Sequence, residues 1–473
     1  MQDGRAVAAA GCAVAAAVYL LWRRRRAEPA PEFTTWEAFD KWFEATYLHA
    51  HGFAFGCTVV VLNSDGVQHQ RVFGGDAEDS IYCFFSTTKI VTTLACLQLR
   101  DRGLLSLDDP VSKHLPAFEA ERPLDDGTGL PAMSAITIRQ CLNHTSGLSY
   151  YWMDPPALTS VAEKEAGEWV LHHDLKCGKD NATIVDEFWS AKAPALFEAG
   201  AHYNYGPGHC IIAAIVEKLS GQSFEEYLQA ALFRPLGMSE TTYHLSPAQC
   251  RRLTPRCPLE MEALAIPWWL KLVTPRFTYP RQGVAYGQPT HDIHTEPHHV
   301  RGDSGLKGTA RDWARLNRML LNLGELDGVR VLSVASVLEM ASTSVSGQLL
   351  EPPFGFQRGV VDARYKAPPR EPAFRVCAAD QFKIRPFNHF PGQTVGLGTL
   401  VIQDATRATC VPSAAGTAWW CGYSSTYFGF NPKTRVGVLL LGHQFPTTET
   451  RTQAFRDLLN AAHQADGADG VLV

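Results

Sequence analysis

The sequence predicts an α+β fold, in which strands from both ends of the chain build one domain and a mostly helical region is inserted between them. Apolar runs typical of buried strands occur at residues 58–63 and 436–441. Between these runs, residues 111–295 show mainly helical patterns. We therefore expect an α/β part formed by residues 34–110 and 296–473, and a helical part formed by residues 111–295.

An uncharged, largely apolar segment at residues 6–22 is followed at once by four arginines. The hydrocarbon core of a bilayer is spanned by ~20 helical residues and accepts as few as ~17. Arginines on the C-terminal flank favour a cytosolic position for everything after them. We expect residues 1–33 to be a single-pass membrane anchor with a short linker, and residues 34–473 to be a cytosolic domain. An organelle-targeting peptide is the alternative.

Local patterns predict the elements of the α/β part. Aromatic side chains recur at intervals of three and four over residues 36–47, which predicts a helix. The strand at residues 58–63 is followed by a Ser-Asp-Gly turn signal and by a second strand near residues 67–74. A helical pattern at residues 448–463 follows the C-terminal strand.

Ser86 and Lys89 lie three positions apart at the start of an apolar helical pattern, for which Gly103 is the expected C-cap. Positions i and i+3 share one face of a helix, so the amine can reach the hydroxyl. Unpaired N–H groups in the first helical turn favour negative charge on an attacked carbonyl, and a partly desolvated lysine loses its proton near neutral pH. We interpret Ser86 as a nucleophile and Lys89 as its base. The alternative is an ordinary N-cap serine.

Composition argues against two classes of function. A net charge of −5 gives no electrostatic reason to expect a nucleic-acid partner. The 12 cysteines show no CxxC or Cys/His metal spacing. A histidine group within residues 291–299 lacks the glutamate of a zinc-binding helix and is interrupted by Pro297. We expect no metal and no cofactor, and reduced, buried thiols.

Six segments and their order along the chain are more specific together than any one motif is alone. They are FSTTK (85–89), LLSLDDPVSKHLPAF (104–118), LNHTSGL (142–148), EKLSGQSFEEY (217–227), RPLGM (234–238) and GDSGLKGTARD (302–312). Over residues 34–463 the chain resembles the serine β-lactamase-like superfamily, which includes class C β-lactamases, DD-peptidases and family VIII-type carboxylesterases. The resemblance implies an antiparallel sheet flanked by helices, an inserted all-α subdomain, and an active site in the cleft between them. It also implies that His144 is a structural residue in a turn.

Superfamily members use a tyrosine in a Tyr-x-Asn motif as a second acid/base group, and the matching stretch here reads GAHYNYGPG. Counting from its first glycine places Tyr205 at the tyrosine position and Pro207 where the asparagine should be. Counting backwards from Glu217 leaves Tyr203 as the alternative. We expect Tyr205 to be catalytic. The missing asparagine amide weakens the interpretation as a β-lactamase.

The stretch WWCGYSSTYFGFNP resembles the Trp-Gly-Gly version of the third superfamily motif, found in family VIII-type esterases. The lysine that β-lactamases carry there is absent, and recognition of a substrate carboxylate usually takes a cation. We expect Trp420, Cys421 and Gly422 to contact the substrate. The backbone N–H groups of Ser86 and Tyr423 are expected to form the oxyanion hole.

Together these features predict a serine hydrolase that acts through an acyl-enzyme on a small-molecule carboxylic ester, which would be lipid-like if the enzyme sits on a membrane. Ser86 would attack the carbonyl, Lys89 would take its proton with assistance from Tyr205, and water or another acceptor would release the acyl group. Acyl transfer is a near alternative. Peptidase, amidase or β-lactamase activity is another, and a catalytically silent, membrane-tethered scaffold is a hypothesis of a different class.

Overall fold

The computed structural model describes residues 31–48, 52–53, 55–119, 122, 124, 132, 134–149, 180–189, 195–254, 257–258, 300–345, 392–445 and 449–465. Its centre is a seven-stranded sheet of order β2-β1-β12-β11-β10-β9-β8, in which neighbouring strands are antiparallel. The strands are β1 (Gly56–Leu62), β2 (Val67–Gly74), β8 (Gln393–Val395), β9 (Leu400–Ile402), β10 (Ala418–Gly422), β11 (Thr426–Asn431) and β12 (Val436–Gly442). β1 pairs with β12, so the two ends of the chain meet in one sheet, as predicted.

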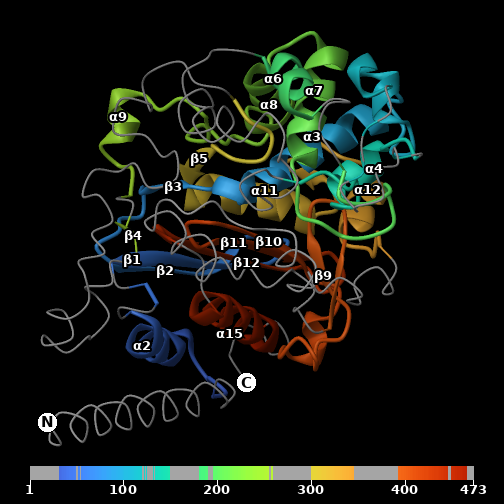
Figure 1. The fold of residues 1–473 in the computed structure, drawn as a ribbon. Coiled ribbons are helices and arrows are strands. Elements are labelled where there is room, and N and C mark those ends of the chain that lie inside the picture. Colours follow the sequence, from blue (N-terminus) through green and yellow to red (C-terminus); the bar gives the residue numbers. More distant parts are fainter. Residues whose placement is uncertain are drawn as a thin grey trace, which may run out of the picture.

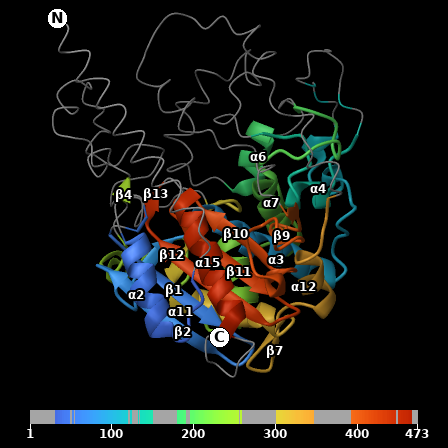
Figure 2. The same ribbon diagram turned by 90° about the horizontal axis from the view of Figure 1, so that it is seen from below.

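Helices cover both faces of this sheet. The helices α2 (Trp36–Tyr47) and α15 (Glu449–Ala465) lie on one face, and α11 (Ala310–Leu321) lies on the other, with α3 (Thr88–Asp101) beyond (Figures 1 and 2). Every residue of β1 and of β12 is buried, which explains why both strands appear in the sequence as continuous apolar runs. The α+β fold class and the predicted terminal helices are confirmed.

The helix α3 ends as the sequence predicts. Gly103 adopts a φ of +73°. Its N–H donates to the Arg100 carbonyl at 2.8 Å, and the N–H of Leu104 donates to the Leu99 carbonyl at 3.0 Å. This pair of bonds is a Schellman motif, in which glycine is favoured because other residues adopt a positive φ only with strain.

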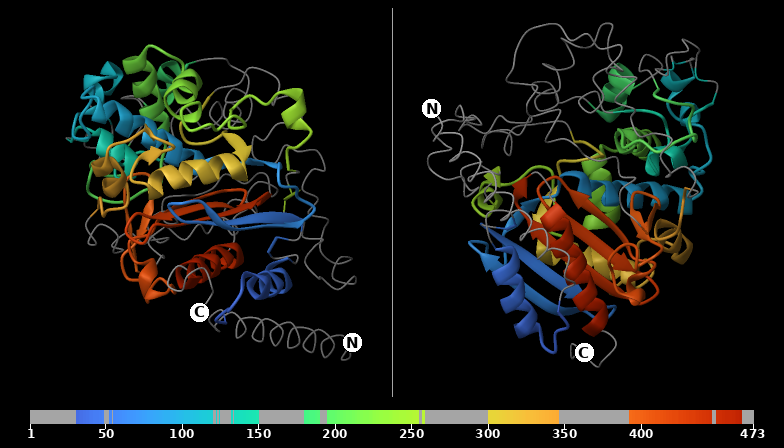
Figure 3. Two further views of the ribbon diagram at one scale, coloured as in Figure 1. Left: turned by 180° about the vertical axis from the view of Figure 1, so that it is seen from behind. Right: turned by 60° about the horizontal axis from the view of Figure 1, so that its bottom comes forward.

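The described part of residues 111–295 is mainly helical. It contains α4 (Ile138–Leu142), α6 (Asn181–Trp189), α7 (Gly208–Ser220), α8 (Phe224–Leu228), the π-helical turn η5 (Gln229–Phe233) and α9 (Pro247–Cys250), with short 3-10 turns. The two-residue strand β4 (Cys257–Pro258) pairs with β13 (Gln444–Phe445). Most of these helices gather beyond α3, on the side away from α2 and α15 (Figure 3).

Two predictions fall on residues outside these ranges: the apolar segment 6–22 and the histidine group at 291–299. Within the described ranges, no helix combines the length and apolar character needed to cross a membrane. The same ranges contain no group of three or more His, Cys, Asp or Glu side chains suited to hold a metal ion.

Candidate active site

Ser86 lies in a strained turn between a strand and a helix. The 3-10 turn η1 (Phe85–Thr87) follows β3 (Ile81–Cys83) and leads directly into α3. Phe85, immediately before Ser86, has a φ of +45°, a region that bulky residues rarely adopt. Such strain persists only where the surrounding structure holds it, and it concentrates at functional sites.

The loop between β10 and β11 and the start of β11 hold this turn. The Ser424 hydroxyl donates to the Cys83 carbonyl at 2.6 Å, and the Thr426 hydroxyl donates to the Phe84 carbonyl at 3.1 Å. In return, the Thr87 hydroxyl donates to the Thr426 carbonyl at 3.1 Å. All five residues are buried or nearly so. These bonds fix the turn that carries Ser86 against strands of the sheet that lie far from this turn in the sequence.

The structure brings three predicted residues together. Ser86 Oγ lies 2.7 Å from Tyr205 Oη and 3.3 Å from Lys89 Nζ. The Lys89 amine also donates to the Asp303 backbone carbonyl at 2.9 Å and lies 4.8 Å from the centroid of the Tyr205 ring. Lys89 is 1% exposed, whereas Ser86 and Tyr205 are half-buried. The hydroxyl is therefore partly accessible, while its neighbouring amine is enclosed.

Burial controls the protonation of both neighbours of Ser86. It lowers the pKa of the Lys89 amine from 10.5 to about 8, although the nearby Asp303 carboxylate acts in the opposite direction. Burial also raises the pKa of the Tyr205 phenol well above 10, opposed by its hydrogen bond with Ser86. A neutral amine is thus available close to neutral pH, while the phenol keeps its proton.

Tyr205 is positioned through its backbone neighbours and His144. The N–H of Gly206 donates to His144 Nδ1 at 3.3 Å, and the N–H of Asn204 donates to the His144 carbonyl at 2.8 Å. The His144 ring lies 4.9 Å from the Tyr205 ring and is stacked on Trp420 at 5.7 Å. His144 is therefore a structural residue in this turn, as expected.

The two candidate tyrosines occupy different positions. Tyr205 contacts Ser86, whereas the Tyr203 ring lies edge-on to His144, with centroids 5.9 Å apart. Pro207, at the position where the superfamily has asparagine, is the N-cap residue of α7. The geometry favours Tyr205 over Tyr203 as the partner of the nucleophile.

The third motif lies on β10, next to the nucleophile turn. A Cβ atom at Gly422 would lie 2.0 Å from the Phe84 carbonyl oxygen, so only glycine allows this approach. Cys421 and Tyr423 are half-buried. Trp420 is 2% exposed and packs beside Tyr205 rather than presenting its face to solvent. Substrate contact by Trp420, Cys421 and Gly422, and an oxyanion hole at the Tyr423 N–H, stay predictions.

Sequence reasoning missed the residues that support the site. The Asp303 carbonyl, with Arg301 paired to its side chain, holds Lys89. The hydroxyl groups of Ser424 and Thr426 hold the turn that carries Ser86. Asp303 lies inside the segment 302–312 that resembles the superfamily, but nothing in the residue pattern shows that it is buried or paired.

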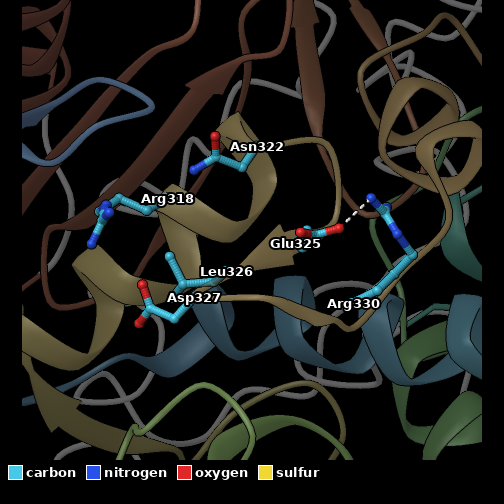
Figure 4. Close-up of a pocket in the computed structure, with 6 residues that line it drawn as sticks. All are labelled: Arg318, Asn322, Glu325, Leu326, Asp327 and Arg330. Carbon is cyan, nitrogen blue, oxygen red and sulfur yellow. Dashed lines mark hydrogen bonds and ion pairs between the residues drawn. The ribbon is translucent and has the colours of Figure 1, made fainter.

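A hollow at the C-terminal end of α11 lies apart from this site. It is lined by Arg318, Asn322, Glu325, Leu326, Asp327 and Arg330 (Figure 4). Glu325 and Arg330 form an ion pair of 2.6 Å across it. None of the residues predicted to be catalytic or substrate-binding lines it.

Several known proteins are similar to this chain in sequence or in fold. A lovastatin esterase of Penicillium rubens is 31% identical over 176 residues, which are 35% of this chain and 40% of that protein. The structure of EstCE1, a hydrolase with promiscuous acyltransferase activity, matches with a TM-score of 0.62 at 19% identity, over 86% of this chain and 93% of that one. Simvastatin synthase (LovD) of Aspergillus terreus matches with a TM-score of 0.59 at 19% identity, over 87% and 94%.

The similarity to the esterase spans less than half of that protein, and the two solved structures establish the fold. The family model described as Beta-lactamase matches residues 44–463, nearly the whole chain. The chain belongs to the Beta-lactamase family of the serine β-lactamase-like superfamily.

Proposed function

We propose that the protein is a serine hydrolase that acts through an acyl-enzyme on neutral carboxylic esters. The observation that carries this proposal is the placement of Ser86 Oγ within 2.7 Å of Tyr205 Oη and 3.3 Å of Lys89 Nζ. A weakly nucleophilic hydroxyl needs an adjacent base, and these distances permit direct proton transfer.

In the first half-reaction, Lys89 takes the Ser86 proton while Oγ bonds to the carbonyl carbon of the ester. The tetrahedral intermediate then loses the alcohol. The proton held by Lys89 reaches the leaving oxygen through the Tyr205 phenol, which gives up one proton and receives another. In the second half-reaction water attacks the acyl-enzyme and the protons move back along the same path.

Backbone N–H groups complete the proposed machinery. The Ser86 N–H belongs to the turn that opens α3, and the Tyr423 N–H follows the close contact between Gly422 and the Phe84 carbonyl. If both N–H groups donate to the oxyanion of the tetrahedral intermediate, they stabilise it. Such stabilisation is often the largest single contribution to the rate enhancement of acyl transfer.

Two sequence features support neutral esters over β-lactams and peptides. Trp420 replaces the lysine of the third motif, and Pro207 replaces the asparagine of the second. The first change removes a cation that would pair with a substrate carboxylate, and the second removes an amide that would bind an acyl-amide chain. The similarity to a lovastatin esterase supports the same substrate class.

Acyl transfer to an alcohol is the second candidate. The description of EstCE1 as a hydrolase with promiscuous acyltransferase activity favours it, because that structure shares the fold. Transfer and hydrolysis share the acyl-enzyme and differ only in which acceptor reaches it.

The test uses a fluorophosphonate probe and p-nitrophenyl esters of graded chain length, with Ser86→Ala as the matched control. Labelling at Ser86 and ester turnover, both lost in Ser86→Ala, are the expected results. An added alcohol that diverts acyl groups from water would establish transfer. Nitrocefin hydrolysis as efficient as ester hydrolysis would favour a β-lactamase. A folded protein that is not labelled by the fluorophosphonate and does not hydrolyse the esters would favour the scaffold hypothesis.

We also propose that residues 6–22 anchor the enzyme to a membrane, with the catalytic domain in the cytosol, because the sequence combines an apolar segment with flanking arginines. Expression of the full chain and of residues 34–473, followed by membrane fractionation and carbonate extraction, tests this. The full chain should stay with the membranes, and the shorter chain should not. Release of the full chain by carbonate would contradict an anchor.

A further inference from the structure

The Lys89 amine is held by a residue that sequence reasoning did not select. Its N–H donates to the Asp303 backbone carbonyl at 2.9 Å, a shorter contact than the 3.3 Å to Ser86 Oγ. The position of this carbonyl therefore helps to decide where the amine lies relative to the nucleophile. A base that is displaced by even one ångström from its hydrogen-bonding position loses much of its effect.

The side chain of Asp303 is a buried anion next to that carbonyl. It is 4% exposed and forms a two-point ion pair with Arg301, with Nε–Oδ1 at 2.8 Å and Nη2–Oδ2 at 2.9 Å. The Ser304 hydroxyl donates to the same carboxylate at 3.2 Å. Two-point pairing of guanidinium and carboxylate fixes orientation as well as charge.

The backbone of this segment is clamped on both sides. A Cβ atom at Gly302 would lie 2.1 Å from the His209 carbonyl oxygen, so the segment packs directly on α7. The Thr92 hydroxyl of α3 donates to the Gly302 carbonyl, and the Tyr243 hydroxyl donates to the Arg301 carbonyl at 2.7 Å. The Asp303 carbonyl is thus presented to Lys89 by a segment with little freedom to move.

Several titratable groups face the Lys89 amine in the described part of the chain: Asp303 and Arg301 from the segment before β5 (Lys307–Thr309), His209 and Cys210 from α7, His144 after α4, Tyr205 before α7, and Cys421 of β10. Burial lowers the pKa of His144 to about 3 and that of His209 well below 6.5. Burial raises the pKa of Cys421 to about 12 and that of Cys210 well above 9. Asp303 and Arg301 form the ion pair of this set.

These two charges act on the amine in opposite directions. The Asp303 carboxylate stabilises the ammonium form of Lys89, and the Arg301 guanidinium destabilises it. We propose that the Arg301–Asp303 ion pair is a positioning element for Lys89. The pair fixes the Asp303 carbonyl that accepts from the Lys89 amine, and the Arg301 guanidinium offsets the charge of the Asp303 carboxylate, so that the amine stays available as a base. This inference rests on the proposed function, because it assumes that Lys89 activates Ser86.

The test follows the pH dependence of Ser86 labelling by a fluorophosphonate in three variants of the full chain. Arg301→Gln leaves the carboxylate unbalanced, so the midpoint of the rise in labelling rate should move to higher pH by about one unit. Asp303→Asn leaves the guanidinium unbalanced, so the midpoint should move to lower pH. The double variant should have a midpoint between those of the two single variants and somewhat below the wild-type midpoint, because the carboxylate acts more strongly on the amine than the guanidinium does. A purely structural role would lower the rate without moving the midpoint in opposite directions.

Arg330→Gln is a matched control, because Arg330 also pairs with a carboxylate but lies at the separate hollow at the C-terminal end of α11. It should leave the midpoint unchanged. Should Asp303→Asn fail to fold in a thermal unfolding experiment, Arg301→Lys carries the test, since it keeps the charge and should restore the wild-type midpoint that Arg301→Gln loses. Equal midpoints in all folded variants, with labelling intact, would overturn the inference alone. Absence of labelling in the wild-type protein at every pH would overturn the proposed function, and with it this inference.

Discussion

Tyr205 Oη lies 2.7 Å from Ser86 Oγ, and the phenol keeps its proton because burial raises its pKa. A protonated phenol can pass a proton on but is not a base. The proposed mechanism therefore assigns the initial proton abstraction to Lys89 and the proton relay to Tyr205.

Tyr205→Phe should reduce kcat/KM for a p-nitrophenyl ester by about 10²- to 10⁴-fold, the usual contribution of a proton-transfer group. Tyr203→Phe is the matched control, because Tyr203 lies beside His144 rather than at Ser86. It should cost less than about tenfold. The reverse ranking of the two variants, measured by initial rates, would assign the catalytic role to Tyr203.

The activity should rise with pH, because the proposed mechanism requires the neutral form of Lys89. The pKa of its amine is lowered to about 8, so the ammonium form predominates below this value and the free amine above it. We expect kcat/KM to increase through pH 8 and then to reach a plateau. Lys89→Arg should abolish this dependence together with most of the activity, since guanidinium keeps its proton. A wild-type profile that is flat from pH 6 to 10 would contradict Lys89 as the base.

Gly422→Ala should lower the activity strongly. The added methyl group would lie 2.0 Å from the Phe84 carbonyl oxygen and 2.4 Å from the Thr426 hydroxyl, so β10 and the nucleophile turn must separate. We expect kcat/KM to fall at least about 10²-fold, since the oxyanion donors would move. Gly66→Ala is the matched control, because open space surrounds that position. Equal activity of the two variants would show that the close contact is dispensable.

The sequence predicted well those parts of the fold that depend on local patterns. The helix at Trp36–Tyr47 and the strand at Val67–Gly74 have the predicted bounds, since periodicity and a turn signal determine both. The pair Ser86 and Lys89 was also predictable, because a helix fixes the spacing of i and i+3.

Other features depend on contacts between distant segments. The bond between Lys89 and the Asp303 carbonyl joins residues 214 positions apart, and a backbone acceptor leaves no mark in residue identity. The packing of Trp420 beside Tyr205 and His144 joins three separate segments, so the sequence of one strand does not predict it. The left-handed conformation of Phe85 was equally hidden, because phenylalanine rarely adopts it.

His144 should make the protein sensitive to acid. Burial lowers its pKa in the folded state to about 3, from 6.5, so the unfolded chain binds more protons between these values. Its contribution to stability is therefore present above about pH 6.5 and is lost as pH falls towards 3. His144→Asn removes this term, and asparagine tolerates the φ of +60° at this position.

Between pH 7 and 4.5, the free energy of unfolding should fall by about 2 kcal/mol more in the wild-type protein than in His144→Asn. Both proteins should still lose some stability, because burial also lowers the pKa of His209. Urea unfolding followed by circular dichroism at the two pH values measures the difference. Parallel losses in the two proteins would mean that His144 titrates normally, and that its ring is not enclosed between Tyr205 and Trp420.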